Sequence, residues 1–238
     1  MTLLDTHIPN LNYQDILANI GVFEMLVKGF IIGVVASAPM GPVGILCVQR
    51  TLNKGRWAGF ATGVGAALSD IIYALITGFG LSFMVDIIED VRIAFWIKLA
   101  GSVILFLFGL FTFRSNPVDK VKPVSHNKGT LIHNFVTGFF VTFSNPLIVF
   151  LFVAMFGQFT FILNENPVPQ ILGYAFIVVG AVAWWFGLTW LIDKIRNRFN
   201  VRGIWVINRI IGVVVMIVSA IMACYTIGLI SFISQYIQ

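Results

Sequence analysis

The stretch Ala38-Pro39-Met40-Gly41-Pro42 lies near the middle of the first long apolar segment, where hydropathy otherwise predicts an unbroken helix. Two prolines three residues apart remove two backbone donors and clash with the carbonyl groups of Val35 and Ala38. In lipid an unsatisfied polar group costs several kcal/mol, so non-helical backbone inside a membrane must contact protein or water. A substrate cavity meets this condition, and the break is therefore the first candidate for a functional site.

The composition is that of a membrane protein. Of the 238 residues, 58% are hydrophobic and 11% are charged, and the mean hydropathy is +0.94. These values lie well outside the range of soluble domains. At about 20 apolar residues per span, the sequence predicts an all-α integral membrane protein with six transmembrane helices. The predicted helices lie near residues 26–49, 57–83, 93–113, 132–158, 169–192 and 204–232.

The basic residues gather at three connections between the predicted helices. Twelve of the 15 Lys and Arg residues lie there, namely Arg50, Lys54, Arg56, Arg114, Lys120, Lys122, Lys128, Lys194, Arg196, Arg198, Arg202 and Arg209. Because cytoplasmic loops are enriched in basic residues, both termini are predicted to lie outside the cytoplasm. The net charge of +5 is therefore interpreted as a topology signal rather than as a nucleic-acid surface.

The ends of the chain and its cysteines add little chemistry. Cys47 and Cys224 each lie in an apolar segment without metal-ligand spacing, so both are interpreted as packing residues. The N-terminus lacks the basic and apolar regions of a cleavable signal peptide. Residues 1–20 fit a short amphipathic surface helix and a disordered tail about equally well.

The longest connection divides the chain into two halves. Residues 114–131 contain Pro117, Pro123 and Gly129 and are predicted to form a cytoplasmic linker. An extracytoplasmic segment is expected at 1–25, a first three-helix repeat at 26–113 and a second at 132–238. Because three spans is an odd number, the second half enters the membrane from the opposite side, so related halves would be inverted repeats.

A second break supports the relationship between the halves. Helix 132–158 contains Asn145-Pro146, and helix 26–49 contains Pro39 and Pro42. Both breaks lie about 13 residues from the helix start, which is roughly 20 Å along a helix. Paired interruptions at matching positions are typical of the binding site of a transporter.

Asp70 is the one carboxylate predicted to lie deep in the membrane, near the centre of helix 57–83. Burying it is costly, and a low dielectric favours its protonated form. It is therefore a candidate proton-coupling residue; the alternative is a protonated side chain with a structural hydrogen bond. Small residues along the same helix, including Gly59 and Gly63, predict close packing on helix 26–49. That packing would bring Asp70 near the first break.

The two breaks offer uncharged partners to a zwitterionic substrate. Carbonyl groups freed before Pro39 and Pro42 accept hydrogen bonds from an ammonium group, and backbone donors after Pro42 can face a carboxylate. Asn145 both donates and accepts. The candidate substrate-binding residues are thus Pro39, Gly41, Pro42, Asn145 and Pro146. The alternative is that both helices are merely kinked to shape the bundle.

These features resemble the LysE/RhtB-type amino-acid exporters of bacteria, the LysE family translocators. The resemblance extends from about residue 25 onward and is carried by residues 29–33, by Pro39, Gly41 and Pro42, by Arg50, Gly55, Arg56, Gly59, Gly63 and Asp70, and by Asn145-Pro146.

The resemblance implies a six-helix carrier of the bacterial cytoplasmic (inner) membrane. Such a carrier exports amino acids or related small metabolites by proton antiport and forms a homodimer. The resemblance implies that the Pro-x-Gly-Pro motif, Asp70 and the Asn-Pro pair carry this function. Leu147 stands where the family often has a basic residue, which argues against recognition of an anion at that position.

Other classes of function remain open at this point. A membrane-embedded scaffold or subunit would use Asp70 to pair with a partner helix. A metal-ion carrier of related fold is a further alternative, although one deep carboxylate is a small ligand set for a divalent cation. No cofactor or metal site is expected. An enzyme is not expected either, because no deep His, Glu or Cys pair accompanies Asp70.

Overall fold

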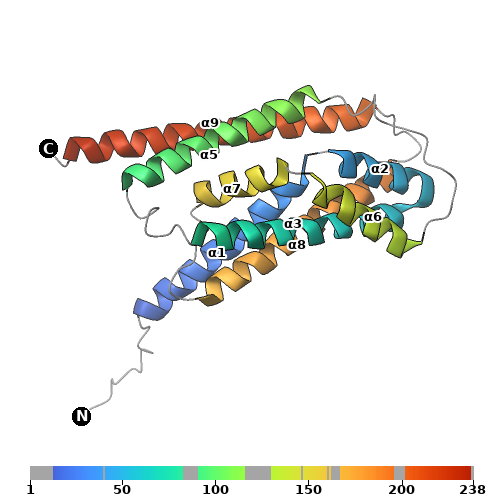
Figure 1. Cartoon of the computed structure of the whole chain (residues 1–238), viewed down its shortest axis with the longest axis horizontal. Coiled ribbons are helices and arrows are strands. Elements are labelled where there is room, and N and C mark those ends of the chain that lie inside the picture. Colours follow the sequence, from blue (N-terminus) through green and yellow to red (C-terminus); the bar gives the residue numbers. More distant parts are fainter. Residues whose placement is uncertain are drawn as a thin grey trace, which may run out of the picture.

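The computed structural model describes residues 13–39, 41–82, 91–115, 130–145, 147–159, 161, 167–195 and 202–236, and all regular structure in these ranges is helical (Figure 1). The helices are α1 (Tyr13–Ser37), α2 (Pro42–Lys54), α3 (Arg56–Ser82), α5 (Val91–Arg114), α6 (Leu131–Phe143), α7 (Leu147–Phe159), α8 (Pro167–Lys194) and α9 (Arg202–Tyr236).

Four of these helices, α3, α5, α8 and α9, are long and apolar enough to cross a membrane. Two further spans result if each bent pair counts as one: α1 with α2, bent by 79°, and α6 with α7, bent by 72°. The predicted all-α membrane fold is therefore confirmed, with interruptions after Ser37 and at Asn145. Pro146 lies outside the described residues, as do residues 1–12.

Local sequence explains the ends of α2. Gly41 is its N-cap residue and Pro42 its first residue, where the missing N–H of proline costs nothing. At the other end Gly55 adopts φ 92°, a conformation that L side chains rarely accept, and its N–H donates to the carbonyl oxygen of Thr51. The chain therefore turns sharply from α2 into α3.

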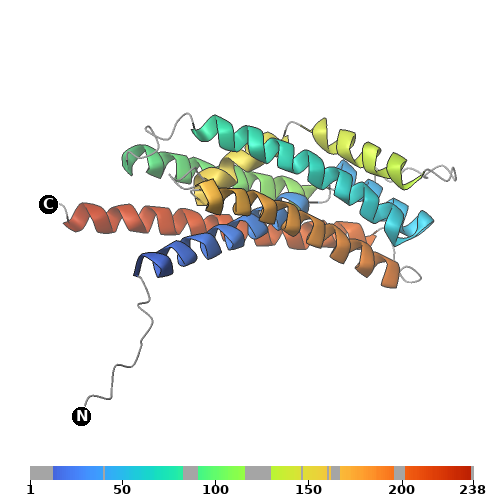
Figure 2. The same ribbon diagram turned by 90° about the horizontal axis from the view of Figure 1, so that it is seen from below.

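The first span sends its two parts to different neighbours. The sequence predicts that the small-residue edge of this span packs on helix 57–83. In the structure, α1 instead packs along α8, while α2 packs on α3 (Figures 1 and 2). The 79° bend is the reason, because it turns the two parts of the span toward different helices. Helix α1 also contacts α3, but much less extensively than it contacts α8.

Glycines allow these helices to approach closely. The carbonyl oxygen of Ile177 on α8 occupies the place that a Cβ on Gly33 of α1 would need. The carbonyl oxygen of Phe30 on α1 does the same at Gly180 of α8. Small residues at such crossings let the backbones approach, which is the main source of helix association in lipid.

The second bent span has a corresponding arrangement. Helix α6 packs on α3, where Gly138 faces the Thr62 carbonyl and Gly65 faces the Phe135 carbonyl. Helices α5 and α9 pack along each other and complete the bundle. The start of α1 and the end of α9 lie at one end of the molecule, and the α2–α3 turn lies at the other (Figure 1).

We expect Gly180→Ala to destabilise the α1–α8 crossing, because the new methyl group would meet the backbone of Phe30. Overpacking of this kind costs about 1–3 kcal/mol, which lowers Tm by roughly 2–12 °C in a chain of this size. Thermal unfolding of the detergent-solubilised protein measures the effect. Gly187→Ala, on the same helix, is the control because the space around Gly187 is open. Equal Tm values for the two variants would contradict the proposed close packing.

Candidate functional site

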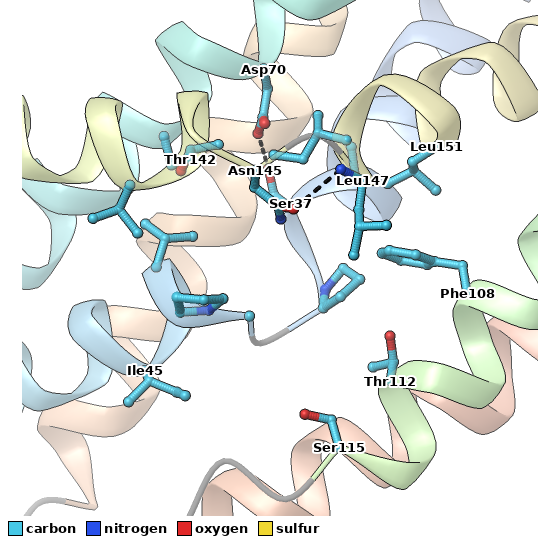
Figure 3. Close-up of a pocket in the computed structure, with 18 of the residues that line it drawn as sticks. Ser37, Ile45, Asp70, Phe108, Thr112, Ser115, Thr142, Asn145, Leu147 and Leu151 are labelled. Atoms are coloured by element: carbon cyan, nitrogen blue, oxygen red, sulfur yellow. Dashed lines mark hydrogen bonds between the residues drawn. The ribbon is translucent and has the colours of Figure 1, made fainter. Parts of the chain in front are cut away.

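A cavity of about 230 Å³ lies where the two breaks meet (Figure 3). Its lining includes Pro39, Gly41 and Pro42 from the first break, Asn145 from the second, and Asp70 from α3. These are the site residues predicted from the sequence, with Pro146 outside the described part of the chain. The cavity is smaller than the roughly 300–1,000 Å³ typical of sites for drug-sized ligands. Its size therefore suits a small metabolite.

Asp70 is nearly fully buried, with 4% of its surface exposed, and it lies beside the first break. The hydroxyl group of Ser37 donates a hydrogen bond to Oδ2 of Asp70 at 3.2 Å. Ser37 is the last residue of α1, so the end of that helix delivers the hydroxyl to the carboxylate. The predicted proximity of Asp70 to the break is confirmed. Ser37 itself was not predicted, because a serine within an apolar span carries no distinctive signal.

Asn145 bridges the gap in the second bent span. Its N–H donates to the carbonyl oxygen of Thr142 at 3.0 Å, and its side-chain Oδ1 accepts from the N–H of Leu147 at 3.2 Å. The side chain thus supplies an acceptor that the interrupted helix lacks. The NH₂ group of the same side chain is a hydrogen-bond donor.

Further polar residues, which were not among the predicted site residues, also line the cavity. Thr112 lies near the end of α5, Ser115 directly follows that helix, Thr142 belongs to α6 and Asn208 lies near the beginning of α9. Thr142 Oγ1 is buried without a hydrogen-bond partner in the described part of the protein. Buried polar atoms are rarely left unpaired. This hydroxyl is therefore a candidate ligand contact.

The other walls of the cavity are apolar. Phe108, Ile148 and Leu151 contribute to them, and Ile45 lies across the cavity (Figure 3). Among the described lining residues, Asp70 is the one charged side chain. The site therefore combines a single carboxylate with neutral donors and an apolar surface.

Arg50 is buried between helices rather than exposed at the membrane surface. Only 5% of it is accessible, and its Nη1 donates to Thr62 Oγ1 at 2.8 Å and to the Asn134 carbonyl oxygen at 2.9 Å. The sequence assigns Arg50 to a basic cluster that sets topology. In the structure it also links α2, α3 and α6, which no periodicity or motif indicated.

The structure offers little to a metal ion. Within the described ranges, no three His, Cys, Asp or Glu side chains come together. A divalent cation takes several oxygen ligands, and the described lining supplies one carboxylate.

We predict that water reaches Thr112 through the cavity. In a variant without native cysteines, Thr112→Cys is expected to react with cationic 2-aminoethyl methanethiosulfonate at least about tenfold faster than Thr189→Cys, because thiol modification requires access. Thr189 is also buried but lies outside the cavity lining, with its hydroxyl bonded to the Trp185 carbonyl oxygen. Mass spectrometry of the solubilised protein measures both rates. Similar slow rates would show that the cavity is closed to water.

Comparisons with known proteins find relatives of this chain. The chain is 26% identical to "Putative amino acid efflux protein YcgF" of Bacillus subtilis (strain 168) over 197 residues, covering 79% of this chain and 89% of the relative. It is 27% identical to "Uncharacterized membrane protein YahN" of Escherichia coli (strain K12) over 173 residues, covering 71% and 75% of the two chains. No solved structure matches it.

A family model matches most of the chain as well. The matched region, residues 34–226, begins just before the first break and ends within α9. It therefore includes both breaks and all the predicted site residues. The chain belongs to the family of LysE type translocators.

Proposed function

We propose that this membrane exporter is a secondary active transporter that moves an amino acid or a similar small metabolite out of the cell in exchange for protons. Members of its family are transporters rather than enzymes. The main support is the position of Asp70, the one charged residue in the described lining of the cavity between the breaks. The amino acid efflux named for the Bacillus subtilis relative supports the substrate class.

Asp70 supplies the coupling in this proposal. Burial of a carboxyl group is tolerated when the group is protonated or when a cation pairs with it. Burial of an unpaired carboxylate is strongly unfavourable. A proton and the ammonium group of a substrate would therefore occupy Asp70 in turn. Exchange of one for the other, on opposite sides of the membrane, drives export with the proton gradient. Ser37 stabilises the ionised form through its hydrogen bond.

The two halves of the chain act as inverted repeats in this proposal. The pairing of helices supports such a relation: α1 packs on α8, and α6 packs on α3. Each bent span thus contacts the middle helix of the other half, while α5 and α9 pair with each other. Movement of one half relative to the other, around the breaks, would give alternating access.

The basic connections face the cytoplasm of a bacterial cell, and both termini lie outside. The same proposal places the protein in the cytoplasmic (inner) membrane. Its support is the distribution of Lys and Arg, concentrated between the predicted helices at residues 50–56, 114–128 and 194–209. A homodimer is also proposed, and it rests on the family resemblance alone.

Orientation can be measured at the linker. In a variant without native cysteines, Ser125→Cys is expected to react with a membrane-impermeant maleimide in inverted vesicles but not in intact cells, because the linker is rich in basic residues. The matched variant Ser234→Cys, near the C-terminus, is expected to give the reverse pattern. Labelling of Ser125→Cys in intact cells would contradict the proposed orientation.

The Asp70→Asn variant tests the coupling role. The amide cannot exchange a proton, so proton-gradient-driven transport in liposomes should fall to the level of protein-free liposomes, with the protein still folded. Asp193→Asn, the same change near the end of α8, is the control and should retain transport. Full proton-driven transport by Asp70→Asn would exclude the coupling role of Asp70. Loss of transport in both variants would show that the effect is not specific to Asp70.

A further inference from the structure

One end of the cavity presents an acceptor and donors close together. Asp70 accepts hydrogen bonds there, and the NH₂ group of Asn145 is a donor. Thr142 lines the same cavity with a buried hydroxyl that has no partner among the described residues. In Figure 3, Asp70, Ser37 and Asn145 lie on one side of the cavity, with Thr142 beside them. An α-amino acid carries its ammonium and carboxylate groups on one carbon, so this end can bind both groups.

The described wall beyond this polar end carries no charged side chain. Phe108, Leu147 and Leu151 lie together there (Figure 3). A second ammonium group, as in lysine, would find no carboxylate, and a second carboxylate would find no basic residue in the described lining. Burial of an unpaired charge is strongly unfavourable. The wall therefore favours an apolar side chain.

The volume limits the size of that side chain. An apolar cavity of about 150 Å³ holds a benzene molecule. The present cavity of about 230 Å³ therefore has room for the polar head of an amino acid and a medium-sized aliphatic side chain. Glycine or alanine would leave much of the apolar wall uncovered and would gain little from the hydrophobic effect.

We infer that the site selects neutral amino acids with medium-sized apolar side chains, such as leucine and methionine. The ammonium group pairs with Asp70, the carboxylate accepts hydrogen bonds from Asn145 and Thr142, and the side chain packs on Phe108 and Leu151. This inference rests on the proposed transport function. It narrows the substrate from amino acids in general to one chemical class.

Ligand binding to the purified full-length protein tests the class directly. The shift in Tm is measured over a concentration series of leucine, methionine, alanine, lysine and glutamate, together with 4-methylpentanoate, which is leucine without its amino group. Leucine and methionine should bind at least about tenfold more tightly than the other four compounds. Counterflow of labelled leucine into liposomes, with each compound as competitor, gives the same ranking by transport.

Phe108→Ala tests where the side chain lies. The ratio of the affinity for phenylalanine to the affinity for leucine should rise at least about tenfold over that of the unmodified protein. The reason is that one aromatic ring is removed from the wall, which enlarges the cavity. Phe106→Ala is the matched control, since Phe106 lies on the same helix, is 41% exposed and is absent from the cavity lining. Its ranking of compounds should not change. If Phe108→Ala does not fold, Phe108→Leu gives a smaller enlargement with the same expected direction.

The outcomes separate the two proposals. Tight binding and transport of lysine or glutamate, with leucine weak, would overturn the inferred class while leaving a transporter. Equal changes in Phe108→Ala and Phe106→Ala would overturn the placement of the side chain. If no amino acid binds or is transported by folded protein, the proposed function itself fails, and the inferred class fails with it.

Discussion

A broken helix inside a membrane frees backbone polar groups, and lipid cannot form hydrogen bonds with them. The rest of this structure depends on that constraint. The first span bends by 79° after Ser37, and the second bends by 72° at Asn145. Helices α3, α5, α8 and α9 contribute the other walls of the cavity where the two breaks meet. Non-helical backbone is tolerated at this depth because it faces protein and a cavity instead of hydrocarbon.

Close packing keeps the two breaks together. Helix α1 crosses α8, and α6 crosses α3, at glycines whose absent side chains leave room for a carbonyl group of the other helix. Arg50 adds hydrogen bonds that connect α2 with α3 and α6. The bends therefore do not loosen the bundle. They direct two short helices into it and leave a cavity beside Asp70.

The cavity-lining residues that the sequence predicted are those that are anomalous in an apolar span. Pro39, Pro42 and Asp70 are each costly in a membrane helix, and that cost made them visible without a structure. Ser37 and Thr142 were not predicted, because hydroxyl groups are common in such helices and usually form hydrogen bonds with the backbone of their own helix. The predicted packing of helix 26–49 on helix 57–83 was right for its second part, α2, and wrong for its first part, α1. The bend angle decides the partner of each part, and no residue pattern encodes that angle.

The sequence by itself determined the class of the protein, its spans and the two positions where they break, because hydropathy and proline act locally along the chain. It also singled out Asp70, since a lone carboxylate is conspicuous among apolar residues. Only the tertiary structure decided that both breaks and Asp70 line one cavity, that Ser37 bonds the carboxylate, and that Arg50 is buried. These features depend on which helices cross and at what angle, and crossings depend on the complementarity of whole surfaces rather than on any single residue.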